Sequence, residues 1–186
     1  ANYSEEFYGL TTMRTGIEKS RNLMTIRLAN KIGIDTILSS AKDFKIEKYL
    51  DKNMSMSLGS GLVTLIDLAN AYGIIANGGK EIKPNIIKSI YSRNGKKIFD
   101  NSNKFCKNCK LEKVDIKSKL PKIEYTAREV LDPKIAYQIT SMMEGVIQRG
   151  TAKSLKDLKI PLAGKTGTTN DNKDAWFIGY SPDLVV

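Results

Sequence analysis

Apolar residues recur every three or four positions along much of the chain, which is the spacing of helices that bury one face. The pattern predicts helices over residues 11–19, 23–31, 35–41, 62–75, 132–150 and 151–158. Thr11-Thr12 and Asp132-Pro133 are typical helix starts, and Gly33 can end the second helix in a left-handed conformation. The helix at 62–75 is apolar on almost every side, so we expect it to be buried.

Two parts of the chain change to the composition of strands. Residues 84–90 are rich in β-formers, Asn94-Gly95 is a strong hairpin turn, and residues 96–99 can form the return strand. Near the C-terminus, a strand around Lys165 precedes a second strand at 176–180. The chain therefore mixes helices with short, locally paired strands.

Positive charge is concentrated in one segment. The 186 residues, a length that suits one domain or most of one, carry a net charge of +10. Residues 80–122 hold 13 Lys or Arg and 4 Asp or Glu, whereas the rest of the chain holds 17 and 16. Residues 100–125 show no clear periodicity, and we interpret them as an inserted loop. A solvated face is the default interpretation of the charge; an acidic polymer, a membrane surface or nucleic acid is the alternative partner.

The residue types present limit the chemistry. With no His, neither Ser-His-Asp nor Cys-His catalysis can occur within this chain, so serine chemistry needs a lysine or a group from outside. Cys106 and Cys109 have the Cys-x-x-Cys spacing, without a third Cys or any His to complete a metal site. A local disulfide, two free thiols and half of a zinc site shared between two chains stay open. In an oxidising compartment the disulfide is favoured.

The segment Gly164–Thr169 combines a cation, hydroxyls and glycine within the length of one strand. Alternation along a strand puts Lys165 and Gly167 on one face and Thr166 and Thr168 on the other. A glycine inside a strand often marks the close approach of a ligand. The segment is suited to hold an anionic, extended substrate along an edge; the alternative is a simple turn and hairpin.

A second candidate motif is Ser20-Arg21-Asn22, between the first two predicted helices. A hydroxyl and a carboxamide two residues apart on such a loop can face one cleft, where the hydroxyl relays a proton and the amide holds a substrate carbonyl. On local grounds alone, the favoured role of Ser20 is to cap the following helix.

Two other segments match short motifs but are rejected as sites. Ser92-Arg93-Asn94 repeats the tripeptide, but Gly95 follows it, which is typical of a hairpin turn. Ser39-Ser40-Ala41-Lys42 has the Ser-x-x-Lys spacing of a serine nucleophile beside a lysine. It ends a short helix and runs into a charged segment, whereas a nucleophile needs a desolvated lysine.

Together and in this order, the motifs resemble those of the transpeptidase domain of class A penicillin-binding proteins. The segments that carry the resemblance are 2–3 with 7–9, 18–25, 58–60 with 63–64, 68–72 with 76–79, 164–169 and 174–182. The resemblance implies an α+β, serine β-lactamase/transpeptidase-like fold with an antiparallel sheet packed against helices, incomplete at both ends. Residues 1–186 would form part of that domain, with a basic hairpin and inserted loop at 80–126.

The resemblance also implies roles for the two motifs. These enzymes cross-link peptidoglycan stem peptides through an acyl-serine, and β-lactams acylate the same serine. Ser20 would pass a proton to the leaving group, Asn22 would hold the substrate amide, and Lys165 would supply positive potential beside Ser20. Thr166 and Thr168 would bind the terminal carboxylate, with Gly167 allowing close approach, and the Thr168 N–H would form half of the oxyanion hole. No metal or cofactor is implied.

The family's Ser-x-x-Lys nucleophile lies several tens of residues before the second motif, and this chain begins 19 residues before Ser20. We therefore expect the nucleophile, a membrane anchor and a glycosyltransferase domain outside this chain, and no acylation of the fragment alone. The implied partners are stem peptides and β-lactams, without nucleic acid, at the periplasmic face of the bacterial inner membrane. The alternatives are a serine β-lactamase, a penicillin-sensing receptor domain and, in another class, a basic nucleic-acid-binding module.

Overall fold

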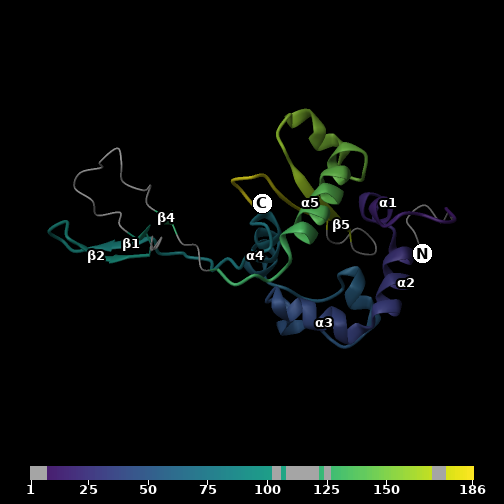
Figure 1. Cartoon of the computed structure of the whole chain (residues 1–186), viewed down its shortest axis with the longest axis horizontal. Coiled ribbons are helices and arrows are strands. Elements are labelled where there is room, and N and C mark those ends of the chain that lie inside the picture. Colours follow the sequence, from purple (N-terminus) through teal and green to yellow (C-terminus); the bar gives the residue numbers. More distant parts are fainter. Residues whose placement is uncertain (1–7, 102–105, 108–121, 124–126, 169–174) are drawn as a thin grey trace. The chain divides into compact units, whose positions relative to one another are not determined.

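The structure, a computed structural model, describes residues 8–101, 106–107, 122–123, 127–168 and 175–186 (Figure 1). The chain divides into two compact units, the first made of residues 1–82 and 129–186 and the second of residues 83–128. Among the described helices, none combines the length and the apolar character needed to cross a membrane.

The described part of the first unit is rich in helices. Its α-helices are α1 Met13–Glu18, α2 Asn22–Ile32, α3 Ile34–Asp43, α4 Leu65–Ala76 and α5 Pro133–Gln148. Its 3₁₀ helices are η1 Glu47–Tyr49, η2 Met54–Leu58 and η3 Lys153–Leu158. The side chains of Thr12, Thr64 and Asp132 cap α1, α4 and α5 by accepting hydrogen bonds from backbone N–H groups. The predicted helices are confirmed, but Gly33 combines φ 84° with an extended ψ of 146°, not the left-handed helical conformation expected.

Helix α4 is buried only in part, so the prediction of a buried helix is wrong for its first turn. Ala71, Gly73 and Ile74 are buried, whereas Leu65 is 67% and Ile66 51% exposed. Helix α4 packs against α5 and β6, and Tyr72 and Ile75 in its later turns contact the buried residues Met143, Ala163 and Tyr180. A helix with apolar residues on almost every side is therefore not buried on every side in this structure.

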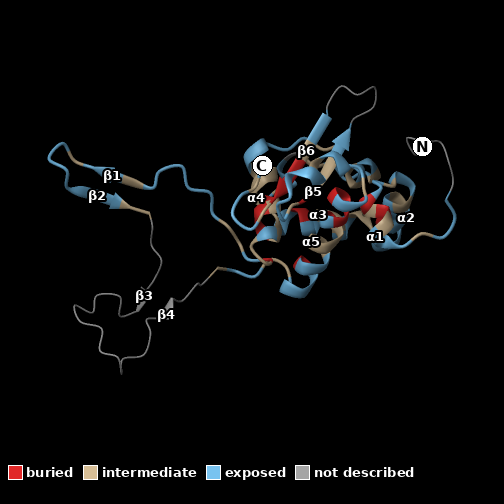
Figure 2. Cartoon of the chain, turned by 90° about the horizontal axis from the view of Figure 1, so that it is seen from above, coloured by how far each residue is buried: buried red, intermediate tan, exposed pale blue. Residues whose placement is uncertain are grey.

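The centre of the first unit is the antiparallel pair β5 Ala163–Thr168 and β6 Ala175–Tyr180. Helix α5 packs against β5, and Figure 2 shows buried residues gathered around these two elements. One buried cluster joins Met143, Ala163 and Tyr180, and a second joins Val146, Ile147 and Ala152. The expected antiparallel strands packed against helices are therefore present.

The second unit contains a hairpin of β1 Ser89–Tyr91 and β2 Lys97–Asp100, which pair antiparallel. The predicted turn is present: the Ser92 hydroxyl donates to the Lys96 carbonyl at 3.0 Å. The β-rich segment predicted at 84–90 pairs only from Ser89 onward, so the first strand begins later than predicted. Pro84 has no N–H to donate to a strand ladder.

A shorter pair, β3 Cys106–Lys107 and β4 Lys122–Ile123, is also antiparallel. Cys109 and most of the predicted loop at 100–125 lie outside the described residues, so the alternatives for the two cysteines stay untested. The division at residues 80–126 likewise stays a prediction.

The chain leaves and re-enters the first unit at one place. Lys80 and Glu129 form an antiparallel bridge, and the Gly79 carbonyl accepts hydrogen bonds from the N–H groups of Val130 at 2.8 Å and Leu131 at 3.0 Å. The two ends of the segment between them are therefore held side by side.

Candidate active site

Ser20 lies at a tight helix end. Helix α1 stops at Glu18, and the N–H of Arg21 donates to the Gly16 carbonyl at 2.8 Å while the N–H of Ser20 donates to the Ile17 carbonyl at 3.1 Å. These two bonds define a Schellman motif, whose left-handed position is usually a glycine. Ser20 occupies that position with φ 52°. A side-chain-bearing residue there is uncommon and points to a constraint from its surroundings.

The hydroxyl of Ser20 contacts the Lys165 side chain. Lys165 Nζ donates to Ser20 Oγ at 2.7 Å and to the Thr166 carbonyl at 2.8 Å. No side chain caps α2, whose N-cap residue is Arg21, so the local expectation that Ser20 caps this helix is wrong. The structure thus joins the two sequence motifs, which are 145 residues apart.

Lys165 is half-buried at the centre of β5. Burial lowers the pKa of its ammonium group, because removing water disfavours the charged form. An ammonium held by one hydroxyl and one carbonyl keeps a third N–H free in principle for an acceptor. The pair can therefore support proton movement at Ser20 Oγ and attract an anionic group to the edge of β5.

The threonines of β5 differ in their surroundings. Thr166 is half-buried, and its Oγ1 lies 2.6 Å from Thr151 Oγ1, in the turn that follows α5. Gly167 and Thr168 are exposed at the end of the strand. The open end of β5 thus offers backbone and hydroxyl groups to a ligand, and Thr151 fixes the Thr166 hydroxyl.

The other predicted site residues are placed as follows. Asn22 is the first residue of α2 and is exposed, two residues after Ser20. The rejected Ser-x-x-Lys segment lies in α3, where Ser40 Oγ donates to the Thr36 carbonyl, an ordinary contact along a helix. Within the part of the chain that the structure describes, no three His, Cys, Asp or Glu side chains gather to hold a metal ion.

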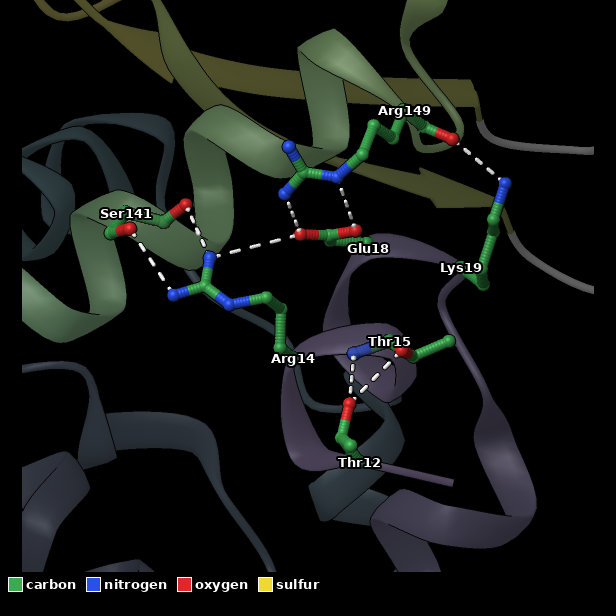
Figure 3. A network of polar contacts seen from close by, with 7 residues as sticks. All are labelled: Thr12, Arg14, Thr15, Glu18, Lys19, Ser141 and Arg149. Atoms are coloured by element: carbon green, nitrogen blue, oxygen red, sulfur yellow. Dashed lines mark hydrogen bonds and ion pairs between the residues drawn. The ribbon is translucent and has the colours of Figure 1, made fainter. Parts of the chain in front are cut away.

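Sequence reasoning missed a polar network around Glu18, two residues before Ser20 in the chain (Figure 3). Glu18 is 5% exposed, the one buried charged residue among those described. Its carboxylate accepts hydrogen bonds from Arg149 Nε at 3.2 Å and Arg149 Nη2 at 2.5 Å, and Arg14 Nη1 lies 3.8 Å away. The hydrogen bonds to Glu18 raise the pKa of Arg149, so its guanidinium stays charged. The one sequence feature that could have pointed to this network is Gly145, because a glycine inside a predicted helix often marks the close approach of another group.

With this geometry established, comparison with known proteins gives the family. Residues 1–184 match the family model of the penicillin binding protein transpeptidase domain. The chain belongs to this family. The resemblance derived from the sequence is therefore confirmed at the level of the family.

Relatives within the family agree in sequence and in fold. Penicillin-binding protein 1A of Rickettsia bellii is 47% identical over 188 residues, which cover 100% of this chain and 24% of the relative. The crystal structure of penicillin-binding protein 1A from Haemophilus influenzae matches with a TM-score of 0.81 and 28% identity, over 99% of this chain and 30% of that one. The PonA1 protein of Mycobacterium tuberculosis, in complex with penicillin V, matches in fold over 99% of this chain and 48% of that one (TM-score 0.74, 24% identity). The chain spans about a quarter of the length of the curated relatives it matches.

Proposed function

We propose that this chain is part of a serine-type D,D-transpeptidase that cross-links peptidoglycan stem peptides and is acylated by β-lactams. The observation that carries the proposal is the 2.7 Å hydrogen bond from Lys165 Nζ to Ser20 Oγ, in a chain that belongs to the penicillin-binding protein transpeptidase family. A serine hydroxyl beside a lysine can transfer a proton without histidine, which this chain lacks. A structural neighbour in complex with penicillin V also supports β-lactams as ligands.

In the proposed reaction, a serine outside this chain attacks the carbonyl of the penultimate D-alanine. Ser20 passes a proton to the departing nitrogen of the terminal D-alanine, and Lys165 stabilises the charge that this transfer leaves on the Ser20 oxygen. Asn22 holds the substrate amide. An amine of a neighbouring stem peptide then takes the acyl group and releases the serine.

The end of β5 would bind the anionic end of the substrate. Thr166 and Thr168 donate hydroxyl hydrogens to the terminal carboxylate, and the exposed Gly167 lets the substrate backbone approach. The N–H of Thr168 supplies half of the oxyanion hole. The parent protein would act at the periplasmic face of the inner membrane, with an anchor and a glycosyltransferase domain outside this chain.

The test uses the full-length protein with Ser20→Ala. Removing the hydroxyl breaks the contact with Lys165, so acylation by a fluorescent penicillin should slow by about 100-fold or more, a usual effect of losing a proton-transfer group. Release of D-alanine from a stem pentapeptide and formation of cross-linked dimers should fall together with acylation.

The chain contains a matched control, because Ser92-Arg93-Asn94 repeats the same tripeptide in the hairpin turn. Ser92→Ala should leave the acylation rate unchanged. Equal acylation rates of Ser20→Ala and Ser92→Ala, or failure of the wild-type protein to react with penicillin and stem peptide, would contradict the proposed function.

A further inference from the structure

Glu18 is a charged side chain placed where charge is costly. It is 5% exposed and lies at the last position of α1, two residues before Ser20. The carboxylate is the buried member of its ion pair, because the Arg149 side chain is 57% exposed. Loss of water around the carboxylate offsets much of the attraction, whereas removing Arg149 would leave a buried charge unpaired. The pair with Arg149 therefore calls for an explanation in terms of the geometry that it imposes.

Apart from the ion pair with Arg14 inside α1, the contacts of Glu18 tie the α1–α2 turn to the end of α5 (Figure 3). Arg149 holds the carboxylate through two nitrogen atoms, which fixes direction as well as distance. The Lys19 ammonium donates to the Arg149 carbonyl at 2.7 Å, and the Thr151 N–H donates to the Glu18 carbonyl at 3.2 Å. Both residues that precede Ser20 are thus attached to residues 149–151.

The facing segment has room for Glu18 because it carries two glycines. A Cβ on Gly145 would overlap the Glu18 carboxylate, and a Cβ on Gly150 would overlap the Glu18 carbonyl oxygen and the α5 backbone at Val146. Both the side chain and the backbone of Glu18 therefore lie in contact with α5 or the turn after it. Because closely packed backbone segments leave little room for movement, this contact fixes the position of the α1–α2 turn.

The same turn after α5 reaches β5. Thr151, whose N–H is bonded to Glu18, contacts the Thr166 hydroxyl at 2.6 Å, and Lys165 beside it contacts Ser20. Glu18, the 149–151 turn, β5 and Ser20 form a closed ring of contacts. Within this ring Ser20 keeps a left-handed conformation that a serine does not favour on its own.

We propose that Glu18 is a positioning residue of the transpeptidase site: by docking on Arg149 and α5, it holds the Ser20 hydroxyl against Lys165. This inference rests on the proposed function. Glu18 touches no reacting group, so it acts only through the position of Ser20. The two hydrogen bonds from Arg149 to the Glu18 carboxylate hold the α1–α2 turn in one position.

The test compares Glu18→Gln with Glu144→Gln in the full-length protein. Glutamine keeps the shape of Glu18 but loses the charge that Arg149 binds; Glu144 is exposed on α5 and gives the same chemical change away from Ser20. We expect Glu18→Gln to slow acylation by a fluorescent penicillin about 10- to 100-fold, the range in which small misplacements of a catalytic group fall. Glu144→Gln should acylate at the wild-type rate.

A double variant separates positioning from a general structural defect. If Glu18 acts through Ser20, adding Glu18→Gln to Ser20→Ala should slow acylation no further, because the hydroxyl that Glu18 positions is already absent. A general loss of structure would add its effect to that of Ser20→Ala, and this outcome would overturn the proposal. So would a wild-type acylation rate for Glu18→Gln.

If Glu18→Gln does not fold, Arg149→Lys gives the same comparison, since the Arg149 side chain is 57% exposed and lysine keeps the charge while losing the two-nitrogen contact. The outcomes also separate the two proposals. Slow acylation of Ser20→Ala with a normal rate for Glu18→Gln removes the positioning role alone, whereas a wild-type protein that is not acylated removes the proposed function and the positioning role with it.

Discussion

Ser20 holds a backbone conformation that its own side chain disfavours. In the Schellman motif that ends α1, its φ of 52° belongs to the position where glycine is usual. The strain of a non-glycine residue there is about 1–2 kcal/mol, and the surrounding contacts must sustain it. A residue chosen only for the fold would be glycine, so the hydroxyl itself is the feature that the chain retains.

This strain leads to a prediction for Ser20→Gly. Glycine adopts the left-handed conformation without strain, whereas Ser20→Ala keeps the Cβ and therefore the strain. We expect Ser20→Gly to be more stable than Ser20→Ala by about 1 kcal/mol, while both lose acylation to the same extent. Thermal unfolding and penicillin acylation of the two purified variants check this, and a lower stability of Ser20→Gly would be inconsistent with the conformation described.

Among the elements, the α4–β6 contact contains a tyrosine pair that makes stability depend on pH. The rings of Tyr72 and Tyr180 lie edge to face with centroids 6.5 Å apart. Burial, with a smaller contribution from Tyr180, raises the pKa of Tyr72 from 10.0 to about 12. Between these two values the unfolded chain releases the proton while the folded chain keeps it, so the free energy of unfolding falls as pH rises.

The prediction for this element is tested with Tyr72→Phe. Because of Tyr72, the free energy of unfolding of the wild-type protein should be about 1.4 kcal/mol lower at pH 11 than at pH 9. The reason is that pH 11 lies one unit above the unfolded-state pKa, and each such unit is worth about 1.4 kcal/mol. Tyr72→Phe should lack this loss. Denaturant unfolding at pH 9, 10 and 11 measures it, with the exposed Tyr137→Phe on α5 as the control. Parallel pH profiles for wild type and Tyr72→Phe would show that Tyr72 is not protected.

Local sequence patterns predicted the helices and strands, but they did not predict the contacts between elements that are distant in the chain. Thr12 and Asp132 are residue types that cap helices through local contacts, so these two starts were predicted. The helix predicted over 62–75 instead starts at Leu65, after its cap Thr64. The role of Ser20 was predicted wrongly on local grounds, because its partner Lys165 is distant in sequence. Only the resemblance to a family brought those two motifs together, and even it gave no indication of the pair of Glu18 with Arg149.

For the whole molecule, the Lys80–Glu129 bridge lies within the first unit and pairs the backbone on either side of residues 83–128, which form the second unit. If the prediction of a separate basic segment at 80–126 is correct, the first unit should fold and act without residues 83–128. Replacing them by Gly-Gly leaves a four-residue loop, Glu81, Ile82 and two glycines, between the paired residues, a length typical of hairpins.

We expect this deletion in the full-length protein to keep the penicillin acylation rate within about twofold of wild type, since no residue of the candidate site lies in the removed segment. Acylation measured alongside far-UV circular dichroism checks both activity and folding. A folded deletion variant that is no longer acylated would show that the segment contributes to the site.

The exposed start of α4 has a consequence for handling this 186-residue chain in isolation. Leu62, three residues before the helix, is 76% exposed, and Leu65 and Ile66 in its first turn are 67% and 51% exposed. Neighbouring exposed apolar side chains of this kind favour self-association. The net charge of +10 makes copies of the chain repel one another at low ionic strength. At 0.1 M salt, repulsion between charges more than about 10 Å apart is largely screened. Its colloidal solubility should therefore fall as salt is added, so dilute buffers suit its purification and storage.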